Sequence, residues 1–162
     1  MPDLLPMAES IGALLKERGE TVAVSESSTG GLVAAALLAV PGASAYFVGG
    51  GVVYTQTSRD VLLQINLDDH PGVRSSSEPY ALLAATAIRD RLGTTWGLSE
   101  TGASGPTGNR YGDAAGHTCI AVTGPAEHTE TLETGLNDRE ANMWRFAQHT
   151  LAVFERTVRD AG

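Results

Sequence analysis

The chain has 162 residues, of which 42% are hydrophobic and 19% are charged, a balance typical of a globular domain rather than of a disordered chain. Its formal net charge is −8, and this acidic excess argues against a surface built to contact nucleic acid phosphates. The single cysteine, Cys119, excludes an internal disulfide and suits a reducing compartment.

Hydrophobic periodicity and turn residues predict helices and strands that alternate along most of the chain. The predicted helices cover residues 4–18, 32–40, 75–92 and 137–158, and a short amphipathic stretch ends at residue 67. The predicted strands cover residues 21–24, 49–55, 95–99, 118–122 and 128–134, and residues 101–116 form the longest predicted loop. Ser75 and Glu78 fit a capping box that opens the third helix, and Asn137 fits a cap for the last one. This order favours one α/β domain over residues 1–162, a three-layer α/β/α sandwich around a mixed, mostly parallel sheet.

The sequence gives no sign of a membrane, a metal or a cofactor. The first residues lack the basic start and unbroken apolar core of a signal peptide, and no apolar run approaches the roughly 20 residues that span a bilayer. The four histidines show no spacing typical of metal ligands. We therefore expect a cytoplasmic protein without a metal or cofactor, in which Cys119 is an inert core residue.

The first candidate site is the loop from Ser25 to Gly31, which joins a predicted strand to a predicted helix. Hydroxyl groups and free backbone N–H groups at a helix N-terminus favour an anion, so Ser27, Thr29 and Gly30 are candidate ligand-binding residues. An ordinary serine-rich helix cap explains the same pattern equally well.

The second candidate site combines Ser44 with Tyr54. Ser44 could act as a nucleophile and Tyr54 could handle its proton, because a hydroxyl needs help from a neighbouring group to attack a carbonyl. The residues alone favour a plainer interpretation, in which Ser44 caps a turn after Pro41-Gly42 and Tyr54 packs at a strand end.

Two further segments carry candidate binding residues. The glycine-rich segment from Thr101 to Gly108 could let backbone approach a substrate, although a mobile surface loop is as good an explanation. Arg139 and Arg145, near the start of the last helix, could meet a phosphate or carboxylate, although a solvated helix face is the favoured interpretation for either arginine alone.

Taken together, these segments resemble the C-terminal domain family of CinA. Ser-Glu-Ser-Ser-Thr-Gly-Gly at residues 25–31 is similar to that family's Ala-Glu-Ser-Cys-Thr-Gly-Gly loop. Thr-Gly-Ala-Ser-Gly-Pro at residues 101–106 resembles its Thr-Gly-Ile-Ala-Gly-Pro loop, and Asp138-Arg139 resembles part of its Gly-Asp-Arg block. The segments 40–44, 51–54 and 77–78 also resemble family blocks, so the likeness extends along nearly the whole chain.

The resemblance implies a homo-oligomeric amidohydrolase that deamidates nicotinamide mononucleotide and releases ammonia. It implies Ser44 as nucleophile, Tyr54 as its assistant and Arg139 as a contact of the nucleotide. It also implies substrate-binding roles for the two loops, through Ser27, Thr29, Gly30, Thr101, Gly102, Ser104 and Gly105.

One position departs from the family pattern in a way that bears on catalysis. The family's catalytic lysine, five residues after the tyrosine, falls on Arg59. A buried lysine can lose its proton and act as a base, whereas arginine keeps its proton and can only stabilise negative charge. Two hypotheses follow: a nicotinamide mononucleotide deamidase weakened by Arg59, or a catalytically silent homologue that binds a nucleotide and has a regulatory or partner-binding role.

Overall fold

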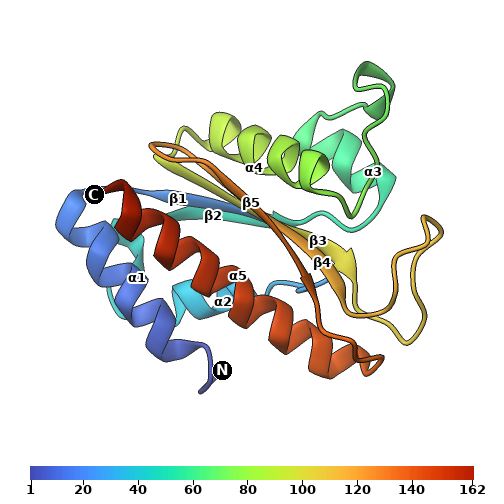
Figure 1. Ribbon diagram of the computed structural model, residues 1–162. Coiled ribbons are helices and arrows are strands. Elements are labelled where there is room, and N and C mark those ends of the chain that lie inside the picture. Colours follow the sequence, from blue (N-terminus) through green and yellow to red (C-terminus); the bar gives the residue numbers. More distant parts are fainter.

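A computed structural model describes residues 1–162 and contains a five-stranded sheet flanked by helices (Figure 1). The strands are β1 (Val22–Glu26), β2 (Phe47–Val52), β3 (Trp96–Ala103), β4 (His117–Thr123) and β5 (His128–Glu133). The helices are α1 (Leu5–Arg18), α2 (Leu32–Leu38), α3 (Gln56–Ser58), α4 (Glu78–Leu92) and α5 (Arg139–Ala161). Short 3₁₀ turns at Ala43–Ala45 and Leu67–Asp69 and a π-helical turn at Arg59–Leu63 complete the regular structure. None of the helices combines the length and the apolarity that a bilayer crossing requires.

The sheet is mixed, with strand order β2-β1-β3-β4-β5. β1 pairs in parallel with both β2 and β3, whereas β4 runs antiparallel to β3 and β5 runs antiparallel to β4. Helices α1, α2 and α5 cover one face of the sheet and α4 covers the other (Figure 1). The predicted α/β/α sandwich with a mixed sheet is therefore confirmed.

Side-chain alternation along β1 explains how two layers of helices are held. Val22 and Val24 point into the main core with α1, α2 and α5, whereas Ala23 between them packs on the α4 side. Part of the α4 side uses small residues, where Ala81 of α4 clusters with Ala121 of β4. Small side chains at these positions let the helix lie close to the sheet.

Several predicted boundaries were wrong; the strand predicted at residues 49–55, for example, is β2 at Phe47–Val52. β3 continues to Ala103, because the start of the predicted loop pairs with the start of β4. Ser77 caps α4, accepting a hydrogen bond from the backbone N–H of Tyr80 at 3.3 Å, so the predicted Ser75 capping box does not form. Asp138, and not Asn137, caps α5.

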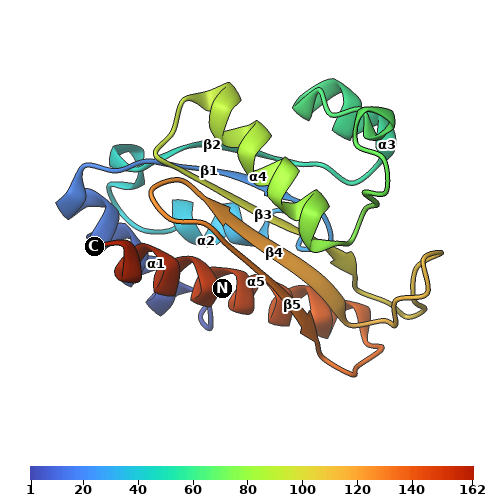
Figure 2. The same ribbon diagram turned by 45° about the horizontal axis from the view of Figure 1, so that its top comes forward.

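The topology decides which loops meet. β1, β2 and β3 are parallel, so the segments that follow them all leave the sheet at the carboxyl ends of these strands. α3 and the loop of residues 104–116 lie beyond this same end of the molecule (Figure 2). A residue that precedes one of these parallel strands lies at the amino ends of the strands, on the opposite side of the sheet.

Candidate functional site

Two adjoining cavities open where the parallel strands end. The main cavity has a volume of about 480 Å³ and is lined by residues that include Ser27, Arg59 and Thr101. The adjacent cavity has a volume of about 210 Å³ and is lined by the glycine-rich loop after β3 and by Arg139. Tyr54 and Gly102 line both cavities, so the two spaces share a wall.

The buried carboxylate of Glu100 holds the Ser27 loop in place. Glu100 is 2% exposed and accepts hydrogen bonds from the backbone N–H groups of Ser27 at 3.1 Å and Thr29 at 3.0 Å. It also accepts hydrogen bonds from the hydroxyl groups of Ser28, Thr29 and Thr118. The Ser27 hydroxyl makes no hydrogen bond within the chain and lines the main cavity, so it is free to meet a ligand.

A second buried carboxylate, Glu26, occupies the N-terminus of α2. It accepts hydrogen bonds from the backbone N–H groups of Gly31, Val33 and Ala34 at 3.2, 2.9 and 2.9 Å. Burial raises the pKa of Glu26 above its usual value, although hydrogen bonds from Thr29 and from the Val33 and Ala34 amides oppose the shift. The helix amides are therefore not free to hold a ligand anion, contrary to the sequence expectation.

Arg139, in the first turn of α5, contacts residues that line the two cavities. Its guanidinium donates to the carbonyl oxygen of Gly105 at 2.5 Å and to the hydroxyl oxygen of Tyr54 at 3.1 Å. Asn142, which is fully buried one turn later, donates to the carbonyl oxygens of Ser104 and Leu136 at 2.8 Å each. The glycine-rich loop and the start of α5 are thus held as one unit.

Arg59 projects from the turn that follows α3. Thr55 and Ser58 form a capping box, and the chain then widens into the π-helical turn that begins at Arg59; such turns are frequent at functional sites. Arg59 is 7% exposed, and its Nε donates to Asp60 Oδ1 at 3.3 Å. Burial raises the pKa of Tyr80, which lines the same cavity, and the charge of Arg59 opposes that shift.

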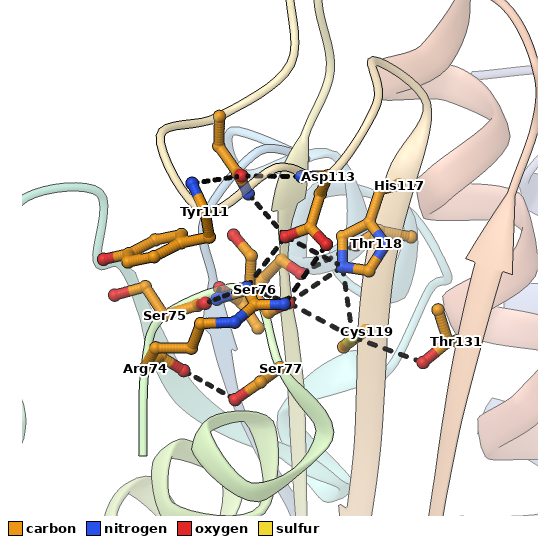
Figure 3. Close-up of polar contacts among 12 residues, drawn as sticks. Arg74, Ser75, Ser76, Ser77, Tyr111, Asp113, His117, Thr118, Cys119 and Thr131 are labelled. Carbon is orange, nitrogen blue, oxygen red and sulfur yellow. Dashed lines mark hydrogen bonds and ion pairs between the residues drawn. The ribbon is translucent and has the colours of Figure 1, made fainter. Parts of the chain in front are cut away.

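Arg110 and Tyr111 line the main cavity and belong to the segment Asn109–Asp113, called the rim loop below. Figure 3 shows Tyr111 and Asp113 of this loop beside Arg74. Arg74, which lies before α4, donates to both carboxylate oxygens of Asp113 at 2.8 and 3.1 Å. Asn109 also donates to Asp113 at 2.8 Å. The ring of Tyr111 lies near the guanidinium groups of Arg74 and Arg110, at 5.0 and 5.1 Å from its centroid. These contacts fix the rim loop against the start of α4.

The structure brings most of the candidate residues together, but not all of them. The main cavity is lined by Ser27, Tyr54, Arg59, Thr101 and Gly102, and the adjacent cavity by Tyr54, Gly102, Ser104, Gly105 and Arg139. Thr29 and Gly30 line neither cavity, because the Thr29 hydroxyl turns inward to Glu26 and Glu100.

Ser44 also lies outside both cavities. It is exposed on the 3₁₀ turn before β2, whereas Tyr54 follows the same strand. A strand of six residues spans roughly 20 Å, so the two residues lie about that far apart, at opposite ends of β2. Within one chain, therefore, the structure does not bring Ser44 to Tyr54 and Arg59.

Sequence reasoning missed several residues of the site. Tyr80, Arg110 and Tyr111 line the main cavity, and nothing local in the sequence singles them out. Glu100 and Asn142 position the loops from behind. Glu100 carried a usable signal, because a carboxylate directly after a predicted buried strand must find hydrogen-bond donors when it is buried.

Comparisons with known proteins agree on one family. The family model for the CinA C-terminal domain matches residues 4–158. A CinA-like protein of Gloeobacter violaceus is 40% identical over 141 residues, which are 85% of this chain and 32% of that protein. A CinA-like protein of Cyanothece is 42% identical over 136 residues, 83% of this chain and 32% of that protein. The chain thus spans about a third of the length of the curated relatives it matches.

Solved structures show the same fold. A CinA superfamily protein from Klebsiella pneumoniae superposes with a TM-score of 0.90 at 23% identity, covering 97% of this chain and 98% of that one. A competence/damage-inducible protein from Agrobacterium tumefaciens gives a TM-score of 0.88 at 24% identity, covering 96% and 95%. The family model and the curated relatives together show that this chain belongs to the CinA C-terminal domain family.

Proposed function

We propose that the chain binds a pyridine mononucleotide, nicotinamide mononucleotide in the first instance, and hydrolyses its carboxamide slowly. The observation that supports this most is the pair of polar cavities that share Tyr54 and Gly102. A mononucleotide has two matching parts, a planar ring with a polar substituent and a phosphate. The main cavity would hold the ring, and the adjacent cavity would hold the phosphate beside Arg139.

We further propose Ser27, rather than Ser44, as the nucleophile. Ser27 lines the main cavity with Tyr54 and Arg59, and its hydroxyl has no partner within the chain. Its oxygen would bond to the carboxamide carbon, the C–N bond would break as ammonia leaves, and water would then release the acid. Tyr54 lines the same cavity and would relay the proton of the Ser27 hydroxyl to the leaving nitrogen. Arg59 would stabilise the oxyanion.

The cavity supplies no strong general base, which is why slow turnover is proposed. No carboxylate, histidine or lysine lines the main cavity. The only lysine, Lys16, lies on α1 and donates to the carbonyl oxygen of Pro41. The absence of a general base costs about 10²–10⁴-fold in rate.

Calorimetry with nicotinamide mononucleotide, combined with an ammonia assay, tests this proposal. We expect saturable binding, slow ammonia release that is lost in Ser27→Ala, and release at least about tenfold faster in Arg59→Lys. Ser44→Ala serves as the matched serine variant. Absence of binding at millimolar ligand would contradict the proposal, and loss of release in Ser44→Ala alone would contradict the role given to Ser27.

A catalytically silent, nucleotide-binding role is the second candidate, and the missing base is the observation that favours it. In that case the mononucleotide binds, but wild type releases no ammonia above the Ser27→Ala background. A gain of release in Arg59→Lys would then identify the arginine as the cause of the silence.

We also propose that the protein self-associates along β2. This strand forms the edge of the sheet, and Val48 and Val52 on it are 51% and 47% exposed. Val61, in the π-helical turn that follows β2 in the chain, is 66% exposed. Antiparallel pairing of two β2 strands would place the start of one beside the end of the other, and so bring Ser44 of a second copy towards Tyr54. Light scattering of wild type and Val48→Lys tests the association, with a monomeric wild type as the contradicting result.

A further inference from the structure

The two terminal nitrogens of Arg59 have no hydrogen-bond partner within the protein, although the side chain is nearly buried. Only Nε is hydrogen-bonded, to Asp60, whose side chain is 47% exposed. The Arg59 side chain itself is 9% exposed. Every side-chain nitrogen or oxygen that is sealed from solvent in this protein has a hydrogen-bond partner. The unpaired Nη1 and Nη2 are therefore open, and the space to which they open is the cavity that Arg59 lines.

The charged side chains that line the two cavities are all cationic, although the protein as a whole is acidic. The chain has 19 acidic residues against 11 lysines and arginines. Even so, Arg59 and Arg110 line the main cavity, Arg139 lines the adjacent one, and no aspartate or glutamate lines either. The hydrogen bond from Arg110 is the largest cause of the lowered pKa of Tyr111, and the charge of Arg59 adds to it. The field inside the cavity thus favours an anionic group.

The chemistry of a guanidinium distinguishes an acid from its amide. Two parallel N–H groups match the two oxygens of a carboxylate, and a charged partner strengthens both hydrogen bonds. A carboxamide offers one oxygen, and its own N–H groups would face the N–H donors of Arg59. Hydroxyl groups of Ser27, Ser76 and Thr101 line the same cavity and add polar partners for either form.

We propose that Arg59 makes the main cavity a carboxylate-binding site, so that this chain holds the acid form of the pyridine mononucleotide in preference to the carboxamide. This inference rests on the proposed function, because it assumes that a pyridine mononucleotide is the ligand. It assigns Arg59 as the residue that decides specificity: a product of amide hydrolysis would bind more tightly than its substrate. The phosphate beside Arg139 is common to both forms and does not discriminate between them.

Calorimetric titration with the mononucleotides of nicotinic acid and of nicotinamide, in one buffer, tests the inference. Wild type should bind the acid at least about tenfold more tightly than the amide. Arg59→Gln should abolish that preference, mainly by lowering the affinity for the acid form. Arg59→Lys keeps the positive charge but loses the two parallel N–H donors of the guanidinium, so it should retain only part of the preference for the acid. Arg91→Gln, an exposed arginine of α4, should leave both affinities unchanged.

The possible failures are distinguishable. If neither mononucleotide binds, the proposed function fails. If both bind and the amide binds as tightly as the acid, the specificity inference fails and the proposed function stands. If Arg59→Gln or Arg59→Lys retains the full wild-type preference, Arg59 is not its source. Circular dichroism of each variant shows whether the fold is kept, and Arg59→Lys gives the decision if Arg59→Gln does not fold.

Discussion

A hydrogen bond of 3.1 Å from Arg139 Nη2 to the hydroxyl oxygen of Tyr54 joins residues that lie 85 positions apart in the sequence. It connects the first turn of α5 to the segment after β2, across the boundary between the two cavities. Since Arg139 also donates to the carbonyl oxygen of Gly105, one guanidinium fixes three parts of the site.

Replacing this arginine tests the assignment of the phosphate. Arg139→Gln should weaken nicotinamide mononucleotide binding by about 10- to 100-fold, because a charge-assisted hydrogen bond to phosphate is lost. The same substitution should weaken the binding of the corresponding nucleoside, which lacks the phosphate, far less. Calorimetry with both ligands gives the comparison, and an equal loss for the two would show that Arg139 does not meet the phosphate.

Removing the Glu100 carboxylate should destabilise the protein and disorder the Ser27 loop. Glu100→Ala leaves the backbone N–H groups of Ser27 and Thr29 and the hydroxyl group of Ser28 without an acceptor, at a cost of about 3 kcal/mol in the free energy of unfolding. The hydroxyl groups of Thr29 and Thr118 keep Glu26 and the Thr101 carbonyl oxygen as acceptors. Urea denaturation measures this cost. Glu9→Gln on the exposed face of α1 is the control and should stay within about 0.5 kcal/mol of wild type; a similarly small change in Glu100→Ala would refute the positioning role.

His117 should make stability depend on pH. Burial alone would lower its pKa, but hydrogen bonds to Glu133 and to the Ser76 carbonyl, with the charge of Asp113, raise it above the usual 6.5. A raised pKa in the folded state gives stability that is fully present below pH 6.5 and is lost as the pH rises through the folded-state value.

Denaturation between pH 6 and 9 is the measurement. The free energy of unfolding should fall with pH in wild type and fall less in His117→Asn, whereas His70→Asn should follow wild type. An identical slope in His117→Asn would mean that the histidine contributes no such dependence.

Cys119 should not react with thiol reagents in the folded protein. It is 2% exposed, and burial raises the pKa of its thiol to about 11, so little thiolate forms at pH 8. A chromogenic disulfide reagent should label no thiol in native protein at pH 8 and one thiol per chain in denaturant. Rapid labelling of the native protein would contradict the burial of Cys119.

Much of the fold follows from local patterns in the sequence. The alternation of helices and strands predicted the α/β/α sandwich, because apolar runs such as Val22–Val24 need a helical layer on each side. The loop at Ser27 and the segment at Thr101 also fall where parallel strands end. Parallel strands gather such segments at one edge, which is why the sequence could identify much of the cavity wall.

The remaining features depend on tertiary contacts that no local pattern reveals. Ser44 looked like a partner of Tyr54, but the two residues flank β2 and so lie at its opposite ends. The amides at the start of α2 looked free for a ligand, but Glu26, the last residue of β1, occupies them. Tyr80 and the rim loop enter the cavity wall only through the packing of α4 and the contact between Arg74 and Asp113.

A crystal structure of the protein with nicotinamide mononucleotide would test the central claim most directly. The account predicts the ring in the main cavity with its substituent next to Arg59 and Ser27, and the phosphate in the adjacent cavity within hydrogen-bonding distance of Arg139. Density for the ligand in any other part of the molecule, with both cavities filled only by water, would contradict it.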